Sequence, residues 1–209
     1  MNRQQDASTR KIILTMLKTQ GPLTVGEMSR KLGITEMAVR RHLNTLERDG
    51  LIDSQLVRQA MGRPTHMYSL TDSADELFPK KYHHLTLDLL EELAAVAGED
   101  KVEMLFERRK ERLIGRYEER IAGKPLSERV KELADIQNAN GYMVEWQAEE
   151  DGSYVLHEHN CPISQVASRY QHACSCELAM FRQLLGTEVE RTECLAKGGN
   201  RCTYRIMER

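Results

Sequence analysis

The stretch TVGEMSRKLGITEMAVRRHLNTLERD, residues 24–49, decides the fold of the chain. Thr24 and Glu27 form a T-x-x-E capping box, which marks the start of a helix. The residues that follow are amphipathic up to Gly33, a residue type that commonly ends helices. The first half of the stretch therefore predicts one short helix.

The second half of the stretch predicts another helix, over Glu36–Asp49, with Thr35 as its N-cap. A three-residue turn, Gly33–Thr35, joins the two helices. The buried stripe of the second helix should consist of apolar residues at helical spacing, Val39, Leu43 and Leu46. Two short helices joined by a tight glycine turn are typical of a helix-turn-helix, whose second helix enters the major groove of DNA.

The flanking residues extend this motif to a winged helix, which we assign to residues 1–73. Apolar residues at helical spacing predict a first helix over Ser8–Gln20. Leu51–Arg58 is rich in Ile, Leu and Val, and together with Tyr68–Leu70 it predicts a hairpin around the turn Met61–Pro64.

Charge divides the chain into a basic and an acidic part. Residues 1–70 carry 11 lysines and arginines against 6 acidic residues, a charge of +5, whereas residues 71–209 carry 19 against 26, a charge of −7. A basic domain on an acidic body is typical of a nucleic-acid-binding module. The expected contacts to double-stranded operator DNA are Thr35, Met37, Arg40, Arg41 and Asn44 on the second helix of the motif, with Arg58 and Arg63 beside the wing tip.

Two other interpretations of this domain stay open. Arg40 and Arg41 are ordinary solvated charges if the three helices form a simple helical subdomain. A winged helix can also contact protein instead of DNA.

Residues 74–140 form a central helical region. The pattern between Asp75 and Asn140 is helical and strongly charged, and Gly98 and Gly123-Lys124-Pro125 divide it into helices. Narrow apolar seams on charged helices commonly pack on a partner chain, and a helix-turn-helix protein generally reads its site as a dimer. We expect a homodimer; the alternative is a monomer in which the seams cover the C-terminal domain. The seams are Leu85, Leu89, Leu93 and Val96, and Val102, Phe106, Leu113 and Tyr117.

Residues 141–209 predict a mixed domain, so the fold class is α+β: an N-terminal winged helix-turn-helix, a central helical dimerisation segment and a C-terminal α+β sensor domain. Strands are expected over Gly141–Gln147 and Ser153–His159, followed by a helix over Cys174–Leu185. Thr187–Cys194 and Cys202–Met207 predict a terminal hairpin.

All five cysteines fall within the 42 residues of this last domain that run from Cys161 to Cys202. Four thiolates in tetrahedral array suit zinc or the corner irons of a cubane cluster. Structural zinc sites usually pair their cysteines as C-x(2–4)-C, a pair that this chain lacks, so the wide spacing favours a cluster. Nearby histidines are either ligands or ordinary surface and core groups: His157, His159 and His172.

Composition excludes several function classes. No apolar run approaches the roughly 20 residues that cross a bilayer, so we expect no membrane partner. The N-terminus lacks the apolar core of a secretory signal, so we expect a cytoplasmic protein with reduced thiols. The sequence contains no GxSxG, Walker, GxGxxG or HExxH motif, and we therefore expect a protein that is not an enzyme. The alternative is an enzyme that uses a reactive thiol or a bound metal.

Over nearly its whole length the chain resembles the SufR-like iron-sulfur-sensing winged-helix repressors, which lie near the DeoR and ArsR types. The resemblance implies a homodimeric repressor that binds operator DNA, carries a [4Fe-4S] cluster and regulates genes for cluster assembly. It rests on ITEMAVRRHLNTLERDGL (34–51), GRPTHMYSLT (62–71), LFPKKYHHL (77–85), EHNCPISQVA (158–167), Glu177-Leu178 after Cys174, LGTEVER (185–191) and GGNRCTYRI (198–206).

The resemblance places three metal ligands at Cys161, Cys174 and Cys202. Other members carry a cysteine about midway between Cys174 and Cys202, where this chain has Thr187-Glu188. We take Cys194 as the fourth ligand and keep Cys176 in reserve. The alternative to a cluster sensor is a winged-helix regulator with structural zinc and a pocket for an organic effector.

Overall fold

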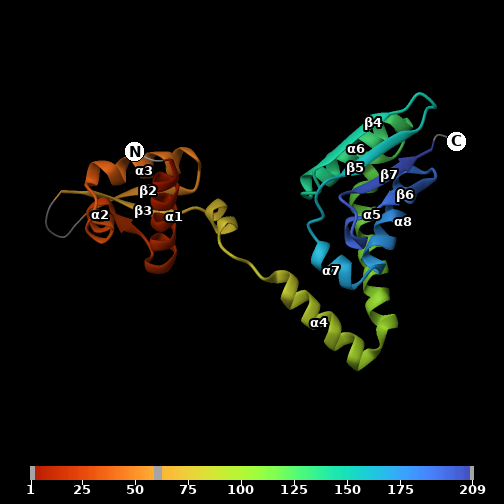
Figure 1. The fold of residues 1–209 in the computed structure, drawn as a ribbon, viewed down its shortest axis with the longest axis horizontal. Helices are drawn as coiled ribbons and strands as arrows, with labels where there is room; N and C mark the ends of the chain where they lie inside the picture. Colours follow the sequence, from red (N-terminus) through yellow and green to blue (C-terminus); the bar gives the residue numbers. More distant parts are fainter. Residues whose placement is uncertain (1–2, 59–62, 208–209) are drawn as a thin grey trace. The chain divides into compact units, whose positions relative to one another are not determined.

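The structure, a computed structural model, describes residues 3–58 and 63–207. The chain divides into two compact units, Met1–Lys80 and Lys81–Arg209 (Figure 1). Each unit has its own hydrophobic core. The fold is α+β, with a winged helix-turn-helix at the N-terminus and a sheet domain at the C-terminus.

The first unit consists of three helices and a small antiparallel sheet in the order β1-β3-β2. Strands β2 and β3 form the wing hairpin, paired in register from Ile52↔Leu70 to Val57↔Thr65. The elements are α1 (Arg3–Gln20), β1 (Leu23–Thr24), α2 (Val25–Leu32), α3 (Glu36–Arg48), β2 (Ile52–Val57), β3 (Thr65–Leu70) and the 3₁₀ helix η1 (Asp72–Leu77).

Local hydrogen bonds confirm the predicted helix starts. The Glu27 amide donates to the Thr24 hydroxyl (3.3 Å) and the Thr24 amide donates to the Glu27 carboxylate (2.7 Å), which completes the capping box. Gly33 ends α2 in the left-handed region (φ 67°), and the Ala38 amide donates to Thr35 Oγ1 at the start of α3. The expected stripe of α3 is buried in the core: Val39, Leu43 and Leu46.

Several elements of the first unit differ from the prediction. Helix α1 begins at Arg3, five residues before Ser8, and β3 begins at Thr65 because its polar first half pairs with β2. Strand β1 was missed, since two residues are too few to show an alternating pattern. In the predicted turn, Met61 and Gly62 lie outside the described residues.

The second unit combines helices with an antiparallel sheet in the order β4-β5-β7-β6. Helix α8 lies along α5, and β4 packs against α6 (Figure 1). The elements are α4 (Tyr82–Ala97), α5 (Glu99–Ile121), α6 (Leu126–Ala139), β4 (Val144–Ala148), β5 (Tyr154–Glu158), α7 (Ser164–Arg169), α8 (His172–Leu185), β6 (Val189–Glu193), the 3₁₀ helix η2 (Leu195–Lys197) and β7 (Cys202–Ile206).

Of the two apolar seams on the central helices, the one on α5 is packed and the one on α4 is exposed. Helices α5 and α6 contribute to the same core as the sheet, where Phe181 and Tyr204 pack with ring centroids 4.8 Å apart. Residues of the seam on α5 lie in or against this core: Phe106, Leu113 and Tyr117. The seam on α4 stays largely exposed, with Leu85 at 56%, Leu89 at 61% and Val96 at 84% exposure.

The C-terminal elements follow the predicted order, and strand β4 begins at Val144 instead of Gly141. Two differences concern helices. Helix α8 begins at His172, so Cys174 and Cys176 lie inside its first two turns instead of at its start. Helix α7 was not predicted, because its six residues are too short for a clear period. No helix within the described ranges combines the length and the apolar character needed to cross a membrane.

Candidate nucleic-acid interface and metal centre

The outer face of α3 presents the side chains predicted to contact DNA. Met37 is 78% exposed, and Asn44, two turns further along the helix, is also exposed. Arg40 forms an ion pair with Glu36 one turn earlier (3.8 Å), so it remains on the open face. Thr35 has a second role, because its hydroxyl already caps the helix.

Arg41 differs from Arg40 because it is paired with another helix. Its guanidinium contacts the Asp6 carboxylate of α1 at 3.0 Å. Asp6 also lies 3.9 Å from Nε2 of His42, a buried neighbour on α3. Arg41 can reach a phosphate only by exchanging this partner, a competition that the sequence pattern did not reveal.

The wing places two further arginines beside its tip. Arg58 directly follows β2 and Arg63 lies two residues before β3, and both are exposed. Because Val57 and Thr65 are the last paired residues of the hairpin, these arginines flank the same end of it. Guanidinium groups at this position can contact phosphates or the minor groove.

Three of the four predicted metal ligands are buried in the core of the second unit: Cys174, Cys194 and Cys202. Cys161 is half-buried in the segment after β5. Cys194 precedes η2 and Cys202 begins β7, and the Leu195 amide donates to Cys202 Sγ at 3.4 Å. Strand ends and a helix therefore bring these distant cysteines into one region.

The thiols of this region share one electrostatic environment. Burial is the main cause that raises the pKa of Cys161 to about 11 and that of Cys174 to about 12, and the nearby Cys194 contributes to both shifts. Burial likewise raises the pKa of Cys202 to about 12, again with a contribution from Cys194. Cys161, Cys174 and Cys202 thus all lie within electrostatic range of Cys194.

The spacing of these thiols bears on the kind of metal centre. Around one zinc ion with Zn–S bonds of about 2.3 Å, tetrahedral sulfurs would lie about 3.8 Å apart. Among the described residues, no three of these sulfurs lie within 4.8 Å of one another. In a cubane cluster each thiolate binds its own iron, so the sulfurs need no such close approach. Without movement, the sulfurs are therefore too far apart to bind one zinc ion together.

Two carboxylates that sequence reasoning missed lie beside the thiols. Glu158 is fully buried and accepts a hydrogen bond from Gln137 Nε2 (2.8 Å), while the Tyr204 hydroxyl donates to Glu177 Oε2 (2.8 Å). Burial raises the pKa of Glu158 to about 9 and also raises the pKa of Glu177. Burial therefore favours the neutral form of both carboxyl groups.

Cys176, the reserve ligand, lies in a different environment. Its thiol donates to Glu107 Oε1 on α5 at 3.2 Å, and His172 Nε2 lies 3.0 Å from the same oxygen. The other two candidate histidines have their own partners. His157 Nδ1 is 3.1 Å from the Thr203 hydroxyl, and His159 Nε2 is 3.4 Å from Glu145.

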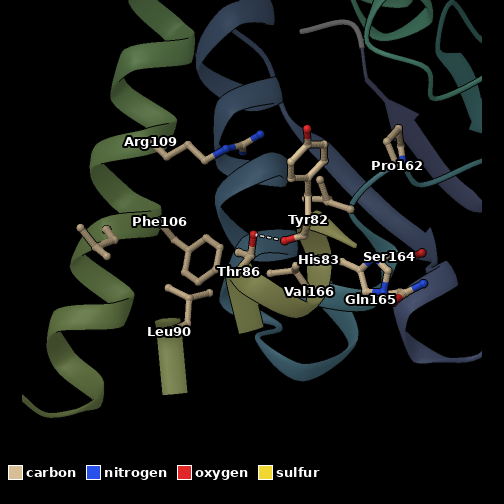
Figure 2. Close-up of a pocket in the computed structure, with 12 residues that line it drawn as sticks. Tyr82, His83, Thr86, Leu90, Phe106, Arg109, Pro162, Ser164, Gln165 and Val166 are labelled. Atoms are coloured by element: carbon tan, nitrogen blue, oxygen red, sulfur yellow. Dashed lines mark hydrogen bonds between the residues drawn. The ribbon is translucent and has the colours of Figure 1, made fainter. Parts of the chain in front are cut away.

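A cavity of about 430 Å³ lies between the first turns of α4, helix α5 and residues 162–166. Figure 2 shows Phe106 pointing from α5 toward Leu90 and Val166, with Arg109 extending from the same helix. Arg109 makes no hydrogen bond or ion pair with the described residues. The cavity therefore combines an apolar body with an available cation, and Pro162 of its wall directly follows Cys161.

The helix-turn-helix and the wing define the first unit as a winged-helix DNA-binding domain. Residues 7–54 match the family model described as bacterial regulatory protein, arsR family, which covers less than half of the chain. The first unit therefore contains an ArsR-type helix-turn-helix, a domain of bacterial regulatory proteins. No curated protein matches the chain.

Several solved structures are similar to parts of the chain. A single-site mutant of Lactococcus lactis ZitR is 27% identical over 47% of this chain and 66% of its own, slightly under two thirds, with a TM-score of 0.29. A MarR family regulator from Neisseria meningitidis is 22% identical over 63% and 76%, with a TM-score of 0.29. Bacillus subtilis PadR in complex with operator DNA is 16% identical over 84% and 93%, with a TM-score of 0.30. At TM-scores this low, these likenesses carry no functional argument.

Proposed function

We propose that the protein is a homodimeric repressor that binds operator DNA and senses iron-sulfur cluster status through a [4Fe-4S] cluster. The proposed ligands are Cys161, Cys174, Cys194 and Cys202. The observation that supports this proposal is the burial of Cys174, Cys194 and Cys202 in one core cluster, where the Leu195 amide donates to Cys202 Sγ. Cys194 is preferred to Cys176 as fourth ligand because the Cys176 thiol is bonded to Glu107 instead. A bound cluster would supply a group that responds to iron and oxidants.

The proposed DNA contacts are the exposed residues of α3 and of the wing. Arg40→Ala should weaken operator binding, with relaxed specificity if Arg40 reads a guanine, or with a uniform loss and a shallower salt slope if it contacts phosphate. Arg41→Ala should cost less than Arg40→Ala, because Arg41 must first leave Asp6. Equal binding by the wild type and Arg40→Ala would place another surface in the groove.

The proposed dimer forms through the exposed seam of α4. Among the α-helices of the second unit, α4 alone has no buried residue in the described structure. Its apolar residues Leu85, Leu89 and Val96 are all more than half exposed. A second copy of the same helix would cover them, as in other helix–helix interfaces.

The proposed coupling between the thiols and the dimer runs through the cavity wall. Residues 162–166 follow Cys161 and line the cavity together with Tyr82 and His83 of α4. A shift at Cys161 would therefore move a wall of the cavity against which α4 lies. In the proposed dimer, this movement would change the distance between the two α3 helices, which should match the half-site spacing of about 34 Å when the protein binds DNA. Such coupling requires only about 1–3 kcal/mol.

The test is anaerobic reconstitution followed by iron and sulfide analysis and gel-shift binding to the protein's own promoter, with and without the cluster. Cys194→Ser should lose cluster iron, and the matched Cys176→Ser should keep it. Operator affinity should differ between the loaded and unloaded wild type. Colourless protein without iron after reconstitution would refute the cofactor proposal, and loss of iron only in Cys176→Ser would refute the ligand set.

A second candidate function is regulation by an organic effector, with zinc at the cysteines. The cavity in Figure 2 favours it, because its apolar body and the available Arg109 suit a small molecule with an anionic group. Zinc retained in air with no visible absorbance, together with normal operator binding, would favour this function over cluster sensing.

A further inference from the structure

We propose that Glu107, His172 and Cys176 form a second metal site, which binds a single divalent transition-metal ion, with zinc the best match. The site is separate from the four cysteines proposed to hold a cluster and does not depend on them. It joins α5 to α8 at the surface of the second unit.

The three side chains already converge on one point. Their ligand atoms all lie within 4.8 Å of one another, and no other group of three histidine, cysteine or acidic side chains in the described residues does so. His172 and Cys176 are four residues apart on α8, so they lie on the same face of the helix. Glu107 faces them from α5, with its Oε1 3.0 Å from His172 Nε2 and 3.2 Å from Cys176 Sγ.

These distances are close to those of a tetrahedral site. Zn–N and Zn–O bonds of about 2.1 Å and a Zn–S bond of about 2.3 Å place N and O about 3.4 Å apart, and S and O about 3.6 Å apart. Each observed pair would need to open by only about 0.4 Å. Rotamer adjustments of this size need no backbone movement.

The donor set selects the class of metal. A thiol, an imidazole and a carboxylate suit zinc and similar transition metals, whereas magnesium and calcium prefer oxygen ligands alone. The Lys110 ammonium holds Glu107 Oε2 at 2.6 Å, which leaves Oε1 to face the site. Three protein ligands leave a fourth position for water or another small ligand.

The two kinds of site diverge from neighbouring positions of α8. Cys174 and Cys176 are two residues apart and therefore point to different sides of the helix. Cys174 lies near Cys194, whereas Cys176 faces Glu107. Cys176 is buried, but His172 and Glu107 are partly exposed, so a metal ion can enter from solvent. Binding here would clamp α5 and α8, two helices of the same core.

The test is cobalt binding to the full-length, metal-free protein under reducing, anaerobic conditions. Bound cobalt, counted after desalting, should fall by one per chain in Cys176→Ala and in His172→Gln, with loss of one thiolate-to-cobalt charge-transfer band in Cys176→Ala. Since outer-shell partners alone change affinity by about 10–100-fold, loss of a ligand should weaken binding by about 100-fold or more. Zinc should displace the cobalt.

Two variants control this test. Glu111→Gln changes an acid that contacts Lys110 but not the site, and should keep the ion. Cys161→Ala removes a proposed cluster ligand and should also keep it. His172→Gln alters a partly exposed residue, so it reports on the site even if Cys176→Ala misfolds. Equal cobalt binding by the wild type, Cys176→Ala and His172→Gln would overturn the proposal, as would loss of this ion in Cys161→Ala alone.

Discussion

Leu89→Ala provides a quantitative test of the proposed α4 dimer. Leu89 is 61% exposed in the single chain, so most of its side chain is available to a partner. The substitution removes about three CH₂ equivalents, worth about 2.4 kcal/mol on full burial and about 1.5 kcal/mol for the exposed fraction. Because the residue occurs twice in a homodimer, the loss is about 3 kcal/mol. Dimer dissociation should therefore increase about 100-fold.

Sedimentation equilibrium over a dilution series measures this dissociation constant. The folded chain should be retained, because alanine is the strongest helix former and Leu89 is little buried. Leu77→Ala is the matched control, since Leu77 is 57% exposed but lies in η1 of the first unit. A dissociation constant for Leu89→Ala within about threefold of the wild type, or an equal loss in Leu77→Ala, would refute the reasoning.

Three further predictions concern stability. Thr24→Ala should cost about 1 kcal/mol of the first unit's stability by removing the cap of α2, whereas Thr45→Ala, whose hydroxyl bonds only the Arg41 carbonyl, should be nearly neutral; urea unfolding followed by circular dichroism distinguishes them. Hydrogen bonds from Thr24 lower the pKa of Glu27, so the stabilisation by ionised Glu27 is complete above the ordinary pKa of 4.5 and disappears as the pH falls through the lowered pKa. In Glu27→Gln, the free energy of unfolding should therefore fall less steeply with acidification. Phe181→Ala should cost about 3–5 kcal/mol in the second unit, measured by the fluorescence of the single tryptophan, Trp146.

The parts of the fold that sequence predicted are those fixed by neighbouring residues. The capping box of Thr24 and Glu27, the Thr35 cap and the stripe of α3 all depend on contacts within a few residues, and the structure confirms each one. The wing hairpin followed from its apolar strands. Short elements escaped, because α7 and β1 contain too few residues to establish a period.

The partners of apolar seams could not be predicted, because a seam does not identify what covers it. The seams on α4 and α5 look alike in sequence, yet Tyr117 is buried in the core while Leu89 is exposed. What decides between them is the position of α8, which packs along α5 and not along α4. That packing depends on residues more than 50 positions away, beyond the reach of a local pattern.

The cysteines show the same limit at a finer scale. From their spacing alone, Cys174 and Cys176 are nearly equivalent as candidate metal ligands. They can be distinguished only once the start of α8 is known, and the structure places that start at His172. Once that start is fixed, helical geometry turns Cys174 toward Cys194 and Cys176 toward α5. The pair His172 and Cys176 then acquires a ligand spacing of four residues, a signal that was present in the sequence. Its third member, Glu107, is 65 residues from His172, so only the packing of α5 on α8 reveals it. One helix thus separates two sulfur environments, and a substitution at either cysteine should affect only one of them.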